Sequence, residues 1–392
     1  MKLHLWQISY IVGLAIVVPL LILDLLGIHL LPETIVPYVE LIGGILLIAG
    51  SCEAFVLSVE GIAHNMHLTD YVAGIYASIA STIPELFVLI FLILGQQYEM
   101  AWILALATIF MNSLVFALYT LVLPKDEEGN FRLPDAIHHV GSDLLTMGSV
   151  ISLSVAFSMI LVHVFPLTPG NELIPQFLDS RELILFGLCL FVVFGAYLYR
   201  ITKYYGKVNP SSDDPYLTGE VKHDVMPKKA LAITMIFAVI GAALGGEALS
   251  SFAHFASGET GLNLPIIHSA LLLVIFGGTP EYIIVASSHR KDELEVALSN
   301  AFGGIVQVFF LIFGFTMIMS GVLGYFDPAA QGLNIMPIEL YSVVLLLFAF
   351  PTMFILRAMI TDDAKINALE SVSMIAVFVM MLYILLFYGG LA

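Results

Sequence analysis

Long apolar stretches alternate with short polar segments along the whole chain. Eleven of these stretches hold about 20 residues or more, the length that a helix needs to cross the hydrocarbon core of a bilayer. The pattern therefore predicts an all-α integral membrane protein with about eleven transmembrane helices. We expect the spans at residues 5–27, 35–60, 70–95, 100–123, 142–165, 182–200, 229–255, 265–289, 294–322, 338–358 and 366–389.

The composition agrees with a membrane location. Hydrophobic residues make up 59% of the chain and charged residues 11%, against about 25% charged residues in ordinary soluble domains. The formal net charge is −17 and no basic patch is present, so we expect no nucleic acid partner. The sequence contains no P-loop, HExxH motif or thiolate metal spacing, and we expect neither a cofactor nor an enzymatic activity. Cys52 and Cys189 lie in apolar stretches and are expected to be buried thiols.

The distribution of lysine and arginine predicts the orientation in the membrane. If the N-terminus lies inside, all of the 14 lysines and arginines except Arg181 fall on the cytoplasmic side, as the positive-inside rule requires. A wrong number of spans would disturb this bias in every later loop. We therefore expect a multi-pass protein of the cell membrane with a cytoplasmic N-terminus and an outside C-terminus.

A hydrophilic segment at 201–228 divides the chain into two similar parts. We interpret 1–30 as an extra N-terminal helix, 31–200 as a first five-helix half, 201–228 as a cytoplasmic linker and 229–392 as a second five-helix half. Halves with an odd number of spans lie inverted in the membrane relative to each other. Inverted halves with interrupted helices at corresponding positions are typical of secondary transporters.

The first half contains a polar stripe in the span at 70–95. Ser78, Ser81, Thr82 and Glu85 are spaced i, i+3, i+4 and i+7, which places them on one helix face. A carboxylate within the bilayer costs roughly 2.5–3.5 kcal/mol on insertion scales, and Pro84 frees backbone carbonyls. This hard oxygen surface favours Ca²⁺ or Na⁺ over soft metals.

The second half contains a similar motif, in which a proline precedes a glutamate, at Thr279, Pro280 and Glu281. A leading glutamate precedes each motif glutamate, Glu53 by 32 residues and Glu247 by 34 residues. Two buried glutamates would balance one Ca²⁺ or several monovalent cations in exchange, which is the electrostatic logic of an antiporter. Buried amides follow in the next span of each half, at Asn112, Asn300 and Gln307.

Other interpretations remain open at this point. The hydroxyl groups of the stripe would also be explained by bonds to their own helix backbone. A cation channel is an alternative, as is an antiporter for Na⁺, K⁺, Mg²⁺ or Mn²⁺. An intramembrane hydrolase would use an aspartate pair or HExxH, and neither occurs in the apolar spans.

The motifs resemble those of the calcium:cation antiporter superfamily, which includes sodium/calcium and calcium/proton exchangers. Each of its inverted repeats carries a Gly-Thr-Ser-x-Pro-Glu or Gly-Asn-Ala-x-Glu motif, where this chain has 80–85 and 277–281. The resemblance implies alternating access, transported Ca²⁺, a counter-ion of H⁺ or Na⁺, and Glu85 and Glu281 as central Ca²⁺ ligands. The residues expected to complete or gate the site are Ser78, Ser81, Thr82, Thr108, Asn112, Thr279, Asn300 and Gln307.

The second repeat departs from the family pattern. Gly277 and Gly278 stand where the first repeat has hydroxyls, four and three residues before the glutamate. The Pro-Glu pairs are similar to the sodium branch, whereas Gln307 is similar to the proton branch. Because the second repeat offers fewer ligands for Na⁺, exchange of Ca²⁺ for H⁺ gains support over exchange for Na⁺. Glu53, Glu60 and Glu247 would then be candidate proton carriers or cation-entry residues.

Overall fold

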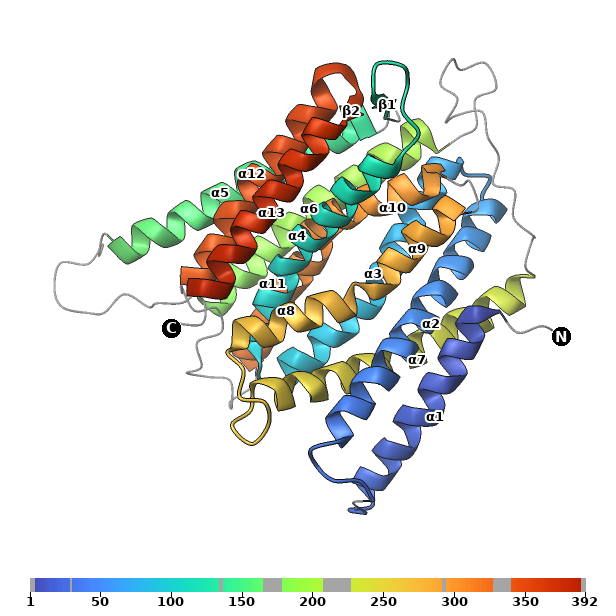
Figure 1. Ribbon diagram of the computed structural model, residues 1–392, viewed down its shortest axis with the longest axis vertical. Coiled ribbons are helices and arrows are strands. Elements are labelled where there is room, and N and C mark those ends of the chain that lie inside the picture. Colours follow the sequence, from blue (N-terminus) through green and yellow to red (C-terminus); the bar gives the residue numbers. More distant parts are fainter. Residues whose placement is uncertain are drawn as a thin grey trace. The chain divides into compact units, whose positions relative to one another are not determined.

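The computed structural model describes residues 4–28, 30–133, 137–164, 178–206, 227–290, 294–326 and 340–388. Helices account for nearly all of it (Figure 1). The elements are α1 (Leu5–Leu25), α2 (Val36–Asn65), α3 (Asp70–Leu94), α4 (Tyr98–Val122), β1 (Asn130–Arg132), η1 (Ile137–Gly141), α5 (Ser142–Val164), α6 (Ser180–Tyr205), α7 (Lys228–Ser257), α8 (Ile266–Gly277), α9 (Thr279–Arg290), α10 (Leu294–Gln307), η3 (Val308–Phe313), α11 (Gly314–Phe326), α12 (Leu340–Asp363), β2 (Lys365–Asn367) and α13 (Ala368–Tyr388).

The predicted all-α membrane fold is confirmed. Ten helical stretches within the described residues are long and apolar enough to span a bilayer, and α13 adds a shorter apolar stretch. The expected span at 265–289 is divided into α8 and α9, and the one at 294–322 into α10, η3 and α11. Most of the expected linker, from 207 to 226, lies outside the described residues, and the division into inverted halves and the orientation stay predictions.

The chain forms two compact units, each assembled from segments far apart in sequence. The first unit comprises Met1–Gly95 and Tyr205–Gly304, and the second comprises Gln96–Tyr204 and Ile305–Ala392. Each unit therefore draws helices from both sides of the expected linker.

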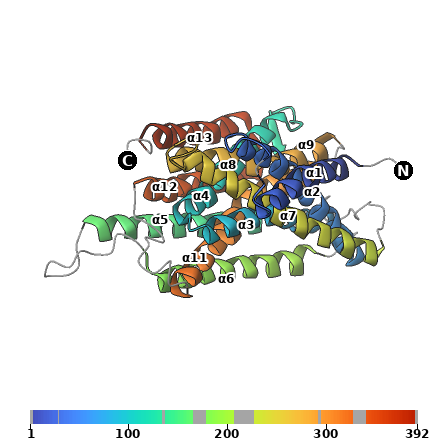
Figure 2. The ribbon, with the colours of Figure 1, turned by 90° about the horizontal axis from the view of Figure 1, so that it is seen from below.

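In the first unit, α1, α2 and α7 lie side by side (Figures 1 and 2). Small residues permit the close approach: a Cβ atom at Gly44 would lie 3.2 Å from the carbonyl oxygen of Gly245. The Tyr10 hydroxyl donates to the carbonyl of Phe237 at 2.7 Å and so joins α1 to α7. In membranes, such close backbone contacts and interhelical hydrogen bonds supply the helix association that water would otherwise drive.

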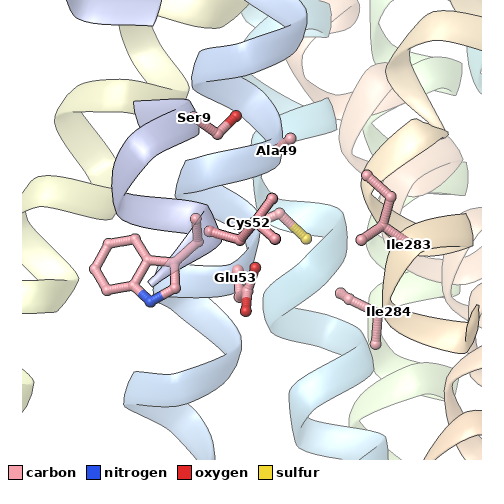
Figure 3. Close-up of a pocket in the computed structure, with 8 residues that line it drawn as sticks. Ser9, Ala49, Cys52, Glu53, Ile283 and Ile284 are labelled. Carbon is pink, nitrogen blue, oxygen red and sulfur yellow. The ribbon is translucent and has the colours of Figure 1, made fainter. Parts of the chain in front are cut away.

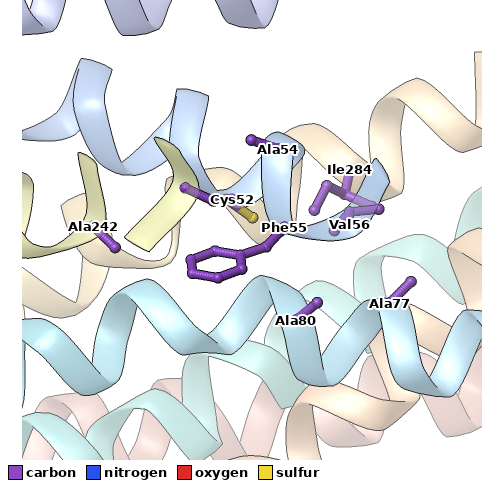
Figure 4. Packing of buried hydrophobic residues seen from close by; sticks show 9 residues of the cluster. Cys52, Ala54, Phe55, Val56, Ala77, Ala80, Ala242 and Ile284 are labelled. Atoms are coloured by element: carbon purple, nitrogen blue, oxygen red, sulfur yellow. The ribbon is translucent and has the colours of Figure 1, made fainter. Parts of the chain in front are cut away.

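A buried cluster in the same unit draws α2, α3, α7 and α9 together (Figure 4). Phe55 of α2 is 1% exposed, and alanines of α3 and α7 surround it. Cys52 belongs to this cluster, as expected for a buried thiol. Cys189 is exposed on α6, and the expectation of burial was wrong there because its apolar helix leaves that face uncovered.

The second unit is built around α4, the most extensively buried of its helices. Trp102 packs edge-on against Phe313 of η3, with ring centroids 5.2 Å apart. The hydroxyls of Thr120 and Ser371 lie 2.7 Å apart and connect α4 to α13. Helix α5 packs along α12 in the same unit.

A two-stranded antiparallel ribbon, which the hydrophobic pattern does not predict, joins two connections of the second unit. Strand β1 follows α4 and strand β2 precedes α13, and Asn130 lies opposite Asn367. The ribbon fixes the ends of four helices to one another through backbone hydrogen bonds.

Charged side chains accompany this ribbon outside the membrane spans. Lys365 Nζ lies 3.3 Å from Glu128 Oε2 and 3.6 Å from Asp126 Oδ2. The N–H groups of Asn130 and Glu128 also donate to Asp126 Oδ1, at 2.8 and 3.0 Å. The hydrogen bond from Asn130 is the main cause that holds the pKa of the exposed Asp126 carboxyl below its usual value.

Candidate cation site

Helix α3 carries the first motif and remains helical through Pro84. The helix begins after Thr69, whose Oγ1 accepts the N–H of Val72 at 3.4 Å and donates to the carbonyl of Tyr205 at 2.7 Å. Proline has no N–H, so Pro84 cannot donate to the carbonyl four residues earlier, at Ala80. The motif therefore contains a carbonyl oxygen without its usual helical donor.

The serine side chains of α3 are directed at α10. Ser81 Oγ lies 2.7 Å from the carbonyl of Ser78 and 3.3 Å from Asn300 Oδ1, and both are acceptors for its proton. Ser78 Oγ donates to the main-chain carbonyl of Asn300 at 3.3 Å. These three residues are buried. The structure thus brings together three of the residues that the sequence assigns to the cation site.

Two threonines of the motifs bond to their own helices. Thr82 Oγ1 donates to the carbonyl of Ile79 at 2.8 Å, and Thr279 Oγ1 donates to the carbonyl of Ile275 at 3.2 Å. Such bonds satisfy a hydroxyl locally and tend to bend a helix. A hydroxyl oxygen that donates its proton keeps lone pairs for a cation, so a ligand role for Thr82 and Thr279 stays a prediction.

The second motif lies at a helix interruption. Helix α8 ends at Gly277, α9 begins at Thr279, and Glu281 is in the first turn of α9. The N–H of Gly278 still reaches the carbonyl of Val274 at 3.0 Å, so the interruption is local.

Glu85 and Glu281 form a buried pair of carboxyl groups. Their exposed fractions are 8% and 5%, and the two groups lie close enough to interact electrostatically. Glu85 Oε2 is buried and has no hydrogen-bond partner among the described residues. Two buried carboxylates without a compensating positive charge are unfavourable. A bound cation, or protons in its absence, would remove that cost.

Other buried polar atoms of this region also lack hydrogen-bond partners among the described residues. Asn300 Nδ2 and Ser299 Oγ are buried and lack hydrogen-bond partners within the described part of the chain. The Cys52 thiol lies within electrostatic range of both glutamates and donates to the carbonyl of Ser81, with 3.6 Å between sulfur and oxygen. The set is rich in oxygen, and no three His, Cys, Asp or Glu side chains among the described residues are placed to hold a metal ion together.

Three further predicted site residues belong to the second unit. Thr108 and Asn112 of α4 and Gln307 of α10 are all buried. Thr108 Oγ1 donates to the carbonyl of Leu104 at 2.8 Å, and Asn112 Nδ2 has no partner among the described residues. Their participation in the cation site stays a prediction.

The three candidate entry glutamates have different environments. Glu53 lines a pocket of about 80 Å³ between α1, α2 and α9, beside Trp6 and Cys52 (Figure 3). Glu60 is half-buried on α2. Glu247 lies within electrostatic range of Glu40 and Asp24. A role in proton or cation entry stays a prediction for all three.

Two residues near the carboxyl pair were not identified as site residues from the sequence. Cys52 donates to the stripe backbone, although its position in an apolar stretch indicated only burial. Tyr282 lies within electrostatic range of Glu281 and Glu85. Its position directly after Glu281 was the signal available in the sequence.

Together, the apolar helices and the buried carboxyl pair beside an interrupted helix describe a membrane-embedded protein with two acidic groups among its packed helices. The family model for sodium/calcium exchanger proteins matches residues 36–203 and 230–387. This chain therefore belongs to the sodium/calcium exchanger protein family, within the calcium:cation antiporter superfamily. Its class of activity is cation antiport, and the family is one of transporters rather than enzymes.

Solved structures of the same fold agree with this assignment. The H⁺/Ca²⁺ exchanger CAX is 13% identical, with a TM-score of 0.67 over 97% of this chain and 88% of that one. Native YfkE is 18% identical, with a TM-score of 0.61 over 99% and 100% of the two chains. The sodium–calcium exchanger NCX_Mj is 13% identical, with a TM-score of 0.54 over 90% and 99%. A search of curated protein sequences gave no significant match.

Proposed function

We propose that this chain moves Ca²⁺ across the membrane in exchange for H⁺ or Na⁺ by alternating access. Glu85 and Glu281 hold the ion, and Ser78, Ser81 and Asn300 set the geometry on one side of it. The observation that carries the proposal is the buried Glu85 Oε2, which has no hydrogen-bond partner among the described residues and lies near a second carboxyl group. Because two carboxylates balance one Ca²⁺, departure of the ion requires protons or Na⁺ to replace it.

Ca²⁺ as the substrate is supported by the donor chemistry and by the names of similar proteins. Carboxylate, carbonyl, hydroxyl and amide oxygens are ligands that Ca²⁺ prefers. Proteins of the same fold are named as H⁺/Ca²⁺ and sodium–calcium exchangers. The hydroxyl-poor second repeat favours H⁺ as the counter-ion, because sites for several Na⁺ ions would need more oxygen ligands.

The test is Ca²⁺ uptake by proteoliposomes under an imposed pH gradient and, separately, an imposed Na⁺ gradient. We expect uptake to depend on one of the gradients, which identifies the counter-ion. Glu85→Gln and Glu281→Gln should each reduce uptake about a hundredfold or more, because removing one partner of a buried charge interaction costs about 3 kcal/mol or more.

Glu259→Gln is the matched control, because Glu259 is exposed in the loop after α7. It should leave uptake unchanged. Uptake that both site variants leave intact would refute the two-glutamate site. Ca²⁺ flux with no dependence on either gradient would indicate a channel, and flux of Mg²⁺, Mn²⁺ or K⁺ alone would indicate another substrate.

A further inference from the structure

The two motifs differ in the hydroxyl groups that they place before their glutamates. Thr82 stands three residues before Glu85, whereas Gly278 stands three residues before Glu281. The residues that follow the glutamates also differ, because the first repeat has Leu86 and the second has Tyr282. The second repeat therefore lacks the hydroxyl three residues before its glutamate and has one directly after it.

The Tyr282 side chain occupies the space that Gly278 leaves open. A Cβ atom at Gly278 would overlap the phenol hydroxyl of Tyr282 and would lie 2.8 Å from its Cζ atom. The phenol therefore lies against the backbone where α8 ends and α9 begins. An aromatic hydroxyl fits here only because position 278 has no side chain.

The hydroxyl of Tyr282 is a buried polar group whose hydrogen-bonding capacity is not used by the described residues. Its oxygen is buried and has no hydrogen-bond partner among the described residues. A buried hydroxyl without a partner is unfavourable. Tyr282 also lies within electrostatic range of both Glu281 and Glu85. An ion held by the two carboxyl groups would supply the missing interaction.

We propose that Tyr282 is a hydroxyl ligand of the second repeat and replaces the one that is absent at Gly278. Its neutral oxygen faces the transported cation, while its ring fills the space at the helix interruption. This role rests on the proposed two-glutamate site. The hydroxyl lies directly after the glutamate instead of one helical turn before it, and position 277 still has none, so the second repeat remains poorer in hydroxyls than the first.

The first test is Tyr282→Phe, which removes one oxygen and keeps the ring. We expect KM for Ca²⁺ to rise about three- to tenfold, the usual effect of losing one hydrogen-bond-strength interaction, with a smaller change in maximal rate. Thermal unfolding without Ca²⁺ should not occur at a lower temperature, because the hydroxyl has no hydrogen-bond partner to lose among the described residues. Tyr197→Phe is the matched control, because Tyr197 is a buried tyrosine of the other unit whose hydroxyl also lacks a partner among the described residues.

The second test transfers the arrangement of the first repeat to the second. Gly278→Thr alone should impair transport strongly, because the new side chain overlaps the phenol. The double variant Gly278→Thr/Tyr282→Leu copies Thr82 and Leu86, and its KM should return to within about threefold of the wild-type value. Tyr282→Leu alone should remain impaired.

An unchanged KM in Tyr282→Phe would overturn the proposal, as would a Tyr282→Leu variant equal to the double variant. These outcomes are distinct from failure of the proposed function. If Glu281→Gln abolishes uptake while Tyr282→Phe keeps its KM, only the role of Tyr282 is wrong. If Glu281→Gln itself has no effect, the two-glutamate site is wrong.

Discussion

Gly246 of α7 provides the sharpest test of the packing behind the site, through Gly246→Ala. A Cβ atom at this position would lie 2.8 Å from the carbonyl carbon of Phe87 and 2.9 Å from the nitrogen of Val88, both in α3. Ordinary van der Waals contact begins near 3.4 Å, so α3 and α7 must separate by about half an ångström or strain locally. The obstructing atoms belong to a backbone, and no side-chain rotation relieves the overlap.

We expect Gly246→Ala to destabilise the first unit by about 1–3 kcal/mol, the usual cost of overpacking a close contact. Thermal unfolding in detergent should therefore begin a few degrees lower. Phe87 and Val88 directly follow Glu85 and Leu86 on α3, so displacement of their backbone also moves the carboxyl group. KM for Ca²⁺ should rise more than the maximal rate falls.

Gly195→Ala is the matched control, because a Cβ atom at Gly195 of α6 has nothing within 4 Å. It should leave stability unchanged or raise it by up to about 1 kcal/mol, as alanine favours a helix over glycine. If Gly246→Ala unfolds at the same temperature as Gly195→Ala and transports with a normal KM, the close α3–α7 contact is wrong.

Two further predictions concern the hydrogen bond between α1 and α7 and the ribbon formed by β1 and β2. Tyr10→Phe removes the hydrogen bond to Phe237 and should lower stability by about 1 kcal/mol, measured by thermal unfolding; an unchanged midpoint would contradict a role for this bond. Spin labels at Asn130 and Asn367 should report one short distance at pH 7 and at pH 5. The pKa of Asp126 is lowered in the folded state. The ionised carboxylate therefore stabilises the ribbon fully above the unfolded-state pKa of about 4. This stabilisation is lost as the pH falls through the pKa of Asp126 in the folded state. Separation of the labels already at pH 5 would refute this.

The sequence was informative about the spans because lipid enforces them. An apolar stretch of sufficient length must satisfy its own backbone as a helix, so α1 to α7 follow the hydropathy pattern closely. The same rule does not fix interruptions. Gly278 divides the span at 265–289, and whether two glycines bend, break or continue a helix depends on what packs beside them. Here Tyr282 occupies that space, a contact that no periodicity predicts.

The site was predictable where spacing along one helix determines proximity. Ser78 and Ser81 share a face of α3, and both reach α10. The partner at Asn300 was identified from the order of polar residues in the repeat. Cys52 was missed because a thiol in an apolar stretch gives no signal of its own, and its contact with Ser81 comes from the packing of α2 on α3. The assembly of each unit from distant segments is likewise a property of packing.

The hydrogen bonds of α3 change the interpretation of the polar stripe. Ser81 gives its proton to acceptors at Ser78 or Asn300, and Thr82 gives its proton to Ile79. Once these protons are used within the protein, the hydroxyl groups can act toward the site only as acceptors, which is the role that a cation requires. Glu85 Oε2 is left without any donor among the described residues. In the proposed two-glutamate site, the hydroxyls would thus orient oxygen lone pairs rather than neutralise the carboxylate, and the transported ions would balance the charge of the glutamates.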